Sequence, residues 1–332
     1  MRVASTLDAL IAGLRGRLCA GIDWEAVIAL ANHTLLTPAL FSSLTSAGNT
    51  DQIPDDVREY LQFIHDYNRE RNQRLRGQLS EAVIALNRAG IVPILLKGAV
   101  PLFISSPDHL PTRMTSDLDL AVEGDEMAAA QACVERIGYL PVAGDRCLTR
   151  SQDVGTLELR PHRPVSLERA IPVEREGMQV KIPTAQSRAL HWIMHDLIKE
   201  GDYWRGRIDL RHLHDLAELA DRDGVDWGQL RASAPDRSVR NAIDTQLLTL
   251  HRFFGTEIPA ECARNPVAHL QCWRRIFTAR HPLIGAPLRL SGNLSWGVRR
   301  LFRPDERPPR GAIDLSRRIV RTLLNARTRS KI

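Results

Sequence analysis

The segment Ile94–Val122 reads ILLKGAVPLFISSPDHLPTRMTSDLDLAV and sets the architecture of the middle third of the chain. It begins with a short apolar run that is typical of a buried strand, passes through Lys97 and Gly98 into a short helical segment, and ends in the alternating run DLDLAV. Side chains of a strand alternate between its two faces, so Asp117 and Asp119 are expected to point the same way. The segment therefore predicts two strands, the second of which carries a pair of carboxylates on one face.

A further acid lies in a later alternating segment, GTLELRPH. Its leucines are expected on one face of a strand, with Glu158 and Arg160 on the other. Together with Asp117 and Asp119, Glu158 would complete a hard oxygen site suited to Mg²⁺ or Mn²⁺, which is usually completed by waters and substrate phosphates. Arg160 would either contact a phosphate or pair with a carboxylate.

The turn after the first strand offers groups that a triphosphate needs. Gly98 allows a ligand to approach the backbone closely, and the N–H groups that open the next helix can bind phosphate. Lys97 and Arg113 would add positive charge. Each feature alone also fits an ordinary strand face or turn. Their order along the chain, followed by the strand of Glu158, favours a site for phosphoryl or nucleotidyl transfer, provided that the three acids converge in a cleft facing this turn.

Helical patterns flank this segment on both sides. Apolar residues recur at helical spacing before Ile91 and again after Thr184, whereas IPVEREGMQVKIP predicts a hairpin that turns near Gly177. The expected class is α+β, with a small mixed sheet and flanking helices. The predicted organisation is an N-terminal helical region over 1–89, an α/β core over 90–183, a C-terminal helical region over 184–300 and a basic tail with a possible helix over 301–332.

Composition narrows the class of protein. The chain has 332 residues, a net charge of +6 and only 5% aromatic residues, which disfavours a stacking platform for single-stranded nucleic acid. Basic residues concentrate in Arg299–Lys331, for which a solvated helix with a disordered end is favoured over a contact with nucleic acid or an anionic surface.

No run is long and apolar enough to span a bilayer. The cysteines are odd in number and lack C-x-x-C spacing, which predicts free thiols, a cytoplasmic location and no structural zinc. They are Cys19, Cys133, Cys147, Cys262 and Cys272.

The order LLKG, Arg, SDLDLAV and GTLELRPH resembles the nucleotidyltransferases of the DNA polymerase β superfamily. It is most similar to a bacterial, largely uncharacterised group with the motif Leu-Lys-Gly, then Arg, then Asp-hydrophobic-Asp-Leu-hydrophobic-Val. The similarity covers most of the chain apart from roughly the last fifty residues. It implies a polymerase β-like core, with Gly98 in the nucleotide-binding turn and Asp117 and Asp119 on the metals. Ser116, which opens SDLDLAV, and Arg113 are assigned with Lys97 and Gly98 to nucleotide binding.

Two residues depart from the pattern of the superfamily. Ala99 follows Gly98 where a serine is usual, so that one hydroxyl contact to phosphate is missing. Glu158 stands where aspartate is common, and His162 follows it as a histidine often does in this group. The resemblance implies that the three acids hold two divalent metals and that Glu158 also accepts a proton.

The resulting prediction is a Mg²⁺- or Mn²⁺-dependent enzyme that transfers a nucleoside monophosphate, with AMP from ATP favoured, to an unknown acceptor and releases pyrophosphate. The acceptor is a small molecule, a peptide or a nucleic acid end. One alternative is a glycosyltransferase that holds a nucleotide sugar through D-x-D. The other is a catalytically inactive member that binds or regulates a partner.

The last third contains further polar residues that invite a metal assignment. His191 and His195 are four residues apart on an expected helix and could share a metal, but no third ligand is evident and packing beside Trp192 is favoured. Asp209 is expected to form a structural ion pair.

Overall fold

The structure is a computed structural model that describes residues 5–106, 110, 112–142, 147–162, 170–301 and 331–332. The chain forms two compact units, of which unit 1 comprises residues 1–35 and 189–332 and unit 2 comprises residues 36–188. Unit 2 contains a mixed seven-stranded sheet together with helices, and the described part of unit 1 is helical. The predicted α+β class is confirmed.

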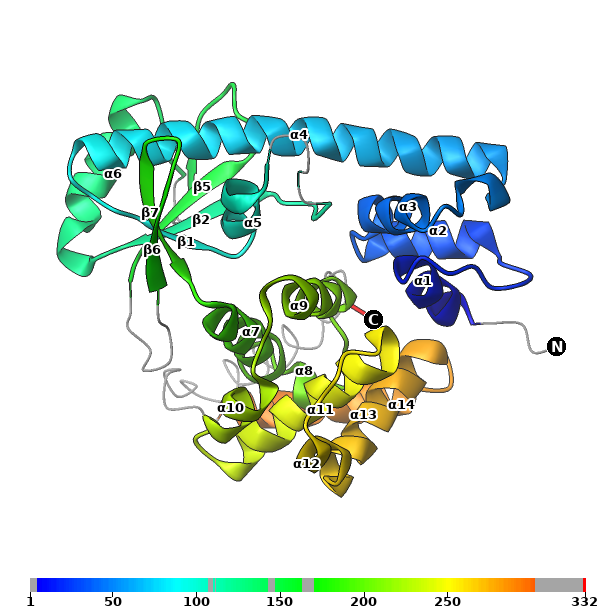
Figure 1. Cartoon of the computed structure of the whole chain (residues 1–332). Helices are drawn as coiled ribbons and strands as arrows, with labels where there is room; N and C mark the ends of the chain where they lie inside the picture. Colours follow the sequence, from blue (N-terminus) through cyan, green and yellow to red (C-terminus); the bar gives the residue numbers. More distant parts are fainter. Residues whose placement is uncertain (1–4, 107–109, 111, 143–146, 163–169, 302–330) are drawn as a thin grey trace, which may run out of the picture. The chain divides into compact units, whose positions relative to one another are not determined.

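The sheet of unit 2 has the strand order β3-β4-β5-β2-β1-β7-β6. Figure 1 labels strands β1, β2, β5, β6 and β7 of this sheet. Its strands are β1 (Ile94–Leu96), β2 (Asp117–Val122), β3 (Leu140–Pro141), β4 (Cys147–Thr149), β5 (Thr156–Pro161), β6 (Ala170–Arg175) and β7 (Met178–Pro183). Strand β2 is antiparallel to β1 and parallel to β5. The register places Asp119 opposite Leu96 on one side and Glu158 on the other. The acids of β2 and β5 therefore lie side by side across two parallel strands.

Alternation along β2 and β5 separates the core from the polar face. Leu118, Leu120, Leu157 and Leu159 are all buried in one hydrophobic cluster with residues of the helices, and each such burial stabilises the fold by about 1.5–3 kcal/mol. The helical elements of unit 2 are α3 (Thr37–Ser46), η1 (Thr50–Gln52), α4 (Asp55–Arg88), α5 (Ala99–Ile104), η2 (Gly124–Glu126) and α6 (Met127–Arg136). The acids on the opposite strand face are thereby kept out of the leucine core.

The hairpin of β6 and β7 forms where it was predicted. Glu176 and Gly177 both have positive φ, 53° and 74°, which is the backbone of a tight two-residue turn whose twist matches the flanking strands. The two strands pair antiparallel from Ala170–Pro183 to Arg175–Met178. β7 then adds in parallel to β1 and extends the sheet beyond it.

Unit 1 is built from helices at both ends of the sequence. They are α1 (Thr6–Leu14), α2 (Trp24–His33), α7 (Ala185–Ile193), the π-helix η3 (Met194–Lys199), α8 (Asp202–Arg205), α9 (Leu210–Asp223), α10 (Trp227–Ala232), α11 (Arg237–Phe254), α12 (Ala260–Ala263), α13 (Pro266–Arg280) and α14 (Ala286–Leu301). Helix α7 begins in unit 2 and ends in unit 1. Of the predicted basic tail, only Leu301, Lys331 and Ile332 are among the described residues.

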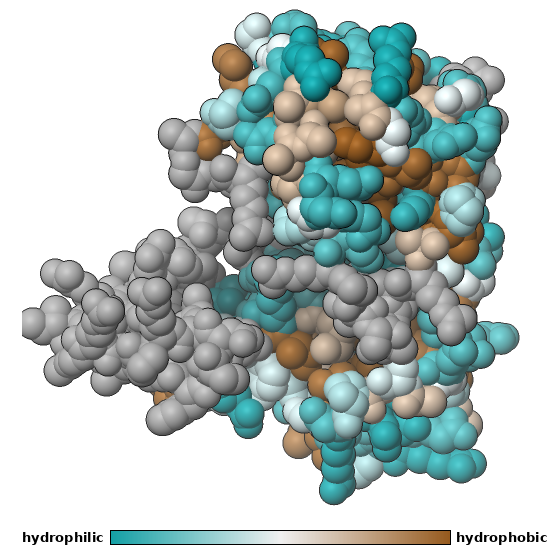
Figure 2. Space-filling view, turned by 90° about the vertical axis from the view of Figure 1, so that its left-hand side faces the viewer, coloured by the Kyte–Doolittle hydropathy of each residue, from teal (hydrophilic) through white to brown (hydrophobic). Residues whose placement is uncertain are grey.

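The surface is mixed in character. Figure 2 shows one face of the molecule, on which hydrophobic residues gather in places among hydrophilic ones. None of the described helices combines the length and the apolar composition that crossing a bilayer requires. All five cysteines are free thiols, as their spacing predicted.

Candidate functional site

Three carboxylates converge on the polar face of the β2–β5 pair. Oxygen atoms of Asp117, Asp119 and Glu158 lie within 4.8 Å of one another. Asp119 is 1% exposed, whereas Asp117 and Glu158 remain partly exposed. The parallel register produces this convergence, because it sets Glu158 directly beside Asp119 while Asp117 follows two residues earlier on the same face.

Two basic side chains neutralise the buried acid. Lys97 Nζ lies 3.0 Å from an oxygen of Asp119, and the guanidinium of Arg160 pairs with that same oxygen. Arg160 also lies 3.1 Å from Glu158. A buried carboxylate needs such partners, because its desolvation would otherwise cost several kcal/mol. Of the two roles considered for Arg160, the structure shows the pairing with carboxylates.

Glu158 differs electrostatically from an ordinary surface glutamate. Burial raises its pKa above the usual 4.5, the Arg160 guanidinium opposes this, and the nearby Asp119 carboxylate adds to it. A carboxyl with a raised pKa binds a proton more tightly than an ordinary glutamate, which suits a group that receives a proton during a reaction.

The turn after β1 has a close-packed backbone. Lys97 has φ of 45°, a left-handed conformation that is uncommon outside glycine. Gly98 has an ordinary helical φ of −67°, so glycine is needed here for a different reason. A Cβ at this position would lie 2.8 Å from both Cγ2 and Oγ1 of Thr115. Gly98 therefore allows the turn to pack against the loop that leads into β2.

Ser116 and Arg113 lie in that loop. The Ser116 hydroxyl donates to Asp117 at 3.0 Å, which places it beside the carboxylates. Arg113 is half-buried three residues earlier, and its backbone carbonyl accepts from Asn72 at 3.0 Å. The structure thus gathers Lys97 and Ser116 around the three acids, while Arg113 lies further back along the loop.

Helix α4 holds this loop in place through residues that the sequence analysis did not single out. The guanidinium of Arg71 donates to the carbonyls of Thr115 and Val154, the latter at 2.7 Å. These carbonyls precede β2 and β5, so that one side chain joins the starts of both acid-bearing strands. Arg71 is therefore a positioning residue for the carboxylate cluster.

Buried amides of α4 extend the same arrangement. Asn68 donates to the Thr112 carbonyl at 3.1 Å, and Gln78 donates to the Gly155 carbonyl at 2.8 Å. Polar residues on the core-facing side of an amphipathic helix are unusual. That irregularity was the one signal in the sequence that could have revealed them.

Comparison with known proteins shows which family the chain belongs to. A sequence profile described as an uncharacterised nucleotidyltransferase matches residues 20–255, which is more than two thirds of the chain and includes every residue of the site. The chain belongs to this nucleotidyltransferase family. The resemblance predicted from the LKG and DLDLAV segments is thereby confirmed.

Two further comparisons bear on this nucleotidyltransferase. No functionally curated protein matches the chain. A solved structure, of an antigenic nucleotidyltransferase-like protein from Paracoccidioides brasiliensis, matches with 16% identity and a TM-score of 0.36 over 58% of this chain and 98% of that one. A TM-score this low supports no argument about the fold, so the assignment rests on the family profile.

Nucleotidyltransferases generally use divalent metals, and the donor set here fits one. All the candidate ligands are carboxylate oxygens, which suit hard cations such as Mg²⁺ and Mn²⁺, and they are close enough to share an ion. Two of the three acids keep some access to solvent, through which an ion and a phosphate could enter.

Proposed function

We propose that this protein transfers a nucleoside monophosphate from a nucleoside triphosphate to an acceptor hydroxyl, phosphate or protein side chain. AMP from ATP is the favoured group. The observation that carries the proposal is the convergence of Asp117, Asp119 and Glu158 beside Lys97 in a member of a nucleotidyltransferase family. The predicted cytoplasmic location fits five free thiols.

The three acids would hold Mg²⁺ or Mn²⁺. When bound, such an ion polarises phosphate oxygens and lowers the pKa of an acceptor hydroxyl. In the reaction, the acceptor oxygen attacks the α-phosphorus, the bond from that phosphorus to the pyrophosphate oxygen breaks, and the acceptor proton passes to an oxygen of Glu158. The raised pKa of Glu158 supports this last role.

Lys97 and Arg160 would change partners when substrate enters. Both contact Asp119 in the free protein, and both side chains retain about a quarter of their exposure, 28% and 25%. Their charge on Asp119 becomes redundant once an ion binds the same carboxylate, and triphosphate oxygens are the natural new partners for an ammonium and a guanidinium. These two residues would thus keep the acids in place before substrate binding and contact phosphate afterwards.

The test is binding and transfer with a matched set of variants. Mn²⁺-dependent binding of a non-hydrolysable ATP analogue is measured by calorimetry, and transfer from α-labelled ATP is followed by label incorporation and pyrophosphate release. Asp117→Asn and Asp119→Asn should lose both. Asp125→Asn, which changes an exposed acid in η2, should lose neither. Equal metal-dependent binding by the site variants and wild type would overturn the proposal.

The same assays separate the alternatives. Consumption of a UDP-sugar without pyrophosphate release from ATP would identify a glycosyltransferase, although the family match favours nucleotidyl transfer. Failure of the wild-type protein to bind Mn²⁺ and the ATP analogue would identify an inactive member of the family.

A further inference from the structure

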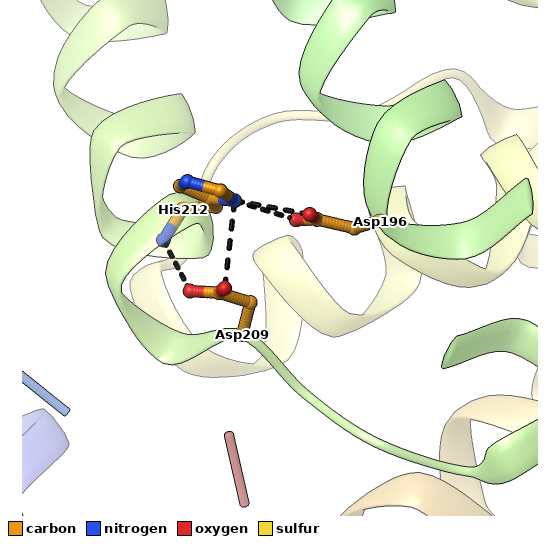
Figure 3. A group of neighbouring side chains, drawn as sticks. All are labelled: Asp196, Asp209 and His212. Atoms are coloured by element: carbon orange, nitrogen blue, oxygen red, sulfur yellow. Dashed lines mark hydrogen bonds and ion pairs between the residues drawn. The ribbon is translucent and has the colours of Figure 1, made fainter. Parts of the chain in front are cut away.

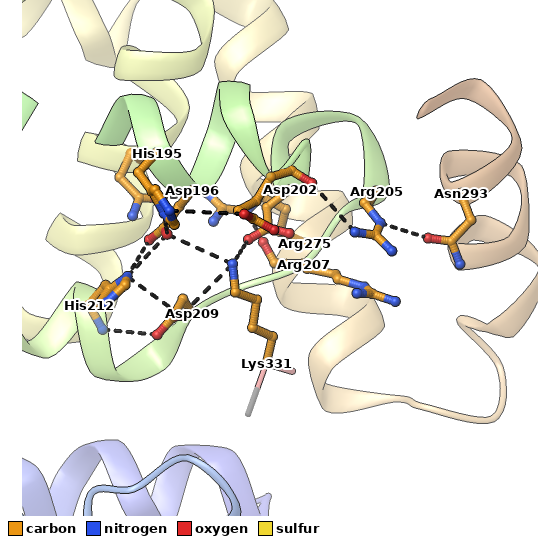
Figure 4. Close-up of polar contacts among 12 residues, drawn as sticks. His195, Asp196, Asp202, Arg205, Arg207, Asp209, His212, Arg275, Asn293 and Lys331 are labelled. Atoms are coloured by element: carbon orange, nitrogen blue, oxygen red, sulfur yellow. Dashed lines mark hydrogen bonds and ion pairs between the residues drawn. The ribbon is translucent and has the colours of Figure 1, made fainter. Parts of the chain in front are cut away.

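A second group of acids lies in unit 1, around the end of the chain. Carboxylates of Asp196, Asp202 and Asp209 surround the ammonium of Lys331 (Figure 4). Lys331 Nζ lies 2.5 Å from Asp202 Oδ2 and 3.8 Å from an oxygen of each of the other two. The acids are 1–4% exposed and the lysine side chain is 7% exposed, so the ammonium is almost fully desolvated.

A π-helical turn and the starts of two helices bring these acids together. Asp196 lies in the π-helix η3, Asp202 is the first residue of α8, and Asp209 is the N-cap of α9. π-helical turns are rare and occur most often at functional sites. The acids therefore form a buried cluster that is assembled from separate elements.

Two of the three acids also interact with another residue, His212. Both oxygens of Asp196 contact His212 Nδ1, at 3.0 and 2.9 Å, and Oδ1 of Asp209 accepts from the His212 backbone N–H at 3.0 Å (Figure 3). Burial alone would raise the pKa of Asp196, but His212, His195 and Lys331 hold it far below its usual value. Asp196 is thus held as an anion, and the contacts with His212 fix the orientation of both carboxylates.

Asp202 depends more directly on the lysine. Its Oδ2 forms the short contact with Lys331, and its buried Oδ1 has no hydrogen-bond partner among the described residues. Arg275, another nearby cation, is fully buried but directs its Nε to the Arg207 carbonyl and its Nη1 to Gln246. The direct counter-charge for Asp202 is therefore the Lys331 ammonium.

The backbone fixes this lysine in register. The N–H of Ile332 donates to the Ile208 carbonyl at 3.0 Å, and the N–H of Ile208 donates to the Ile332 carbonyl at 2.7 Å. Ile208 directly precedes Asp209, so that the chain end pairs with the segment that carries one of the acids. Two backbone hydrogen bonds thus hold Ile332 against Ile208, and the neighbouring Lys331 side chain lies among the acids.

We propose that Asp196, Asp202 and Asp209 form a binding site for a primary alkylammonium group, which the chain fills in cis with its own Lys331. An ammonium fits better than a metal ion, because a metal would have to displace the contacts of His212 with Asp196 and Asp209. This site is separate from the proposed nucleotidyl transfer site and does not depend on it.

The test is chemical rescue in the full-length chain. Lys331→Ala removes the ammonium and most of its aliphatic stem, and it should lower the melting temperature by several degrees. n-Butylammonium chloride should restore the melting temperature saturably in this variant, whereas tetramethylammonium chloride at equal ionic strength should not. Wild type should respond to neither salt. Adding Asp202→Asn to Lys331→Ala should abolish the rescue, while adding Asp221→Asn, which changes an exposed acid on α9, should preserve it.

Hydrogen exchange provides a second measurement, which also serves if the alanine variant does not fold. In Lys331→Met, which keeps the aliphatic stem, the Ile208 and Ile332 amides should exchange at least tenfold faster than in wild type. Three results would overturn the proposal: unchanged melting and exchange in both variants, a folded alanine variant that n-butylammonium does not rescue, or Zn²⁺ binding to the wild-type chain that Asp209→Asn abolishes.

Discussion

The two units each gather three carboxylates around basic side chains, but they do so with different accessibility. In unit 2, Asp117 and Glu158 remain partly exposed, and the basic partners of Asp119 keep about a quarter of their exposure, 28% for Lys97 and 25% for Arg160. In unit 1, the acids are at most 4% exposed and Lys331 is 7% exposed. The first cluster is therefore open to exchange of its cations, whereas the second is closed around one.

This difference shows that a count of carboxylates does not identify a metal site. What distinguishes the two clusters is whether the counter-charges can leave. Partly exposed side chains can turn from a carboxylate to a phosphate when an ion binds. Lys331 is buried, and its neighbour Ile332 forms two backbone hydrogen bonds with Ile208, so the ammonium cannot leave without local unfolding.

The largest expected effect is on nucleotidyl transfer. Replacing both Asp117 and Asp119 by asparagine keeps their shape but removes the charge that would hold the ion, and transfer should fall by on the order of 10²–10³ or more. Label incorporation from α-labelled ATP measures the loss. Asp125→Asn should stay within about twofold of wild type. Comparable activity in the double variant would break the distinction between the two clusters.

The next effect is on the stability of unit 1. Lys331→Met leaves buried carboxylates without their ammonium, and removing one partner of a buried pair costs about 3 kcal/mol. Chemical denaturation followed by tryptophan fluorescence measures the change, with Lys199→Met, at an exposed lysine of η3, as the control. A loss no larger than that of the control would show that the second cluster is as open as the first.

The turn at Gly98 should tolerate no side chain unless the neighbouring Thr115 is made smaller. Gly98→Ala places a methyl group 2.8 Å from two atoms of Thr115, and overpacking of this kind costs about 2 kcal/mol. Thr115→Ala removes both atoms, so the double variant should recover most of the loss in a double-mutant cycle. Additive losses in the cycle would show that the close approach is not what requires glycine.

Metal binding by unit 2 should depend on pH through Glu158. Its pKa is raised above 4.5 by burial, so the protonated form persists at higher pH and competes with the ion. Mn²⁺ affinity should rise by up to about tenfold per pH unit until Glu158 is ionised.

The metal-free fold should lose stability as pH rises from about 4.5 through the pKa of Glu158, because the folded state binds the Glu158 proton more tightly than the unfolded state does. Glu158→Gln should remove the pH dependence, and Glu174→Gln, at an exposed position of β6, should keep it.

The smallest expected effect is on the affinity of unit 2 for Mn²⁺. Arg160→Met removes one cation that competes for Asp119, and Mn²⁺ affinity should rise by a factor of about two to five, as expected for a partly exposed pair. Calorimetric titration of both proteins would measure it. Weaker binding in the variant would mean that Arg160 organises the acids rather than competing with the ion.

Local patterns predicted the part of the fold that depends on local rules. Alternation in DLDLAV and TLELRP specified β2 and β5, and the Gly177 turn specified the hairpin, because strand faces and tight turns follow from neighbouring residues. Asp117, Asp119 and Glu158 could be predicted as site residues for the same reason. The parallel register that sets Asp119 beside Glu158 comes from the order of strands in the whole sheet, which no short segment encodes.

The contacts that could not be predicted join residues far apart in the sequence. Arg71 reaches Val154 across 83 positions, and Lys331 reaches Asp202 across 129. Each looks like an ordinary basic surface residue in the sequence, and only tertiary packing gives it a buried partner. Asp209 was expected in an ion pair and forms one, but its partners, His212 and Lys331, had to come from the structure.

The position of Mn²⁺ in crystals grown with a non-hydrolysable ATP analogue distinguishes the two clusters most directly. Anomalous scattering peaks are expected among Asp117, Asp119 and Glu158, with Lys97 contacting the triphosphate and no peak at Asp196 and Asp209. A bound analogue with no manganese at the strand acids, or manganese held only by the unit 1 acids, would rule out the metal site proposed for unit 2.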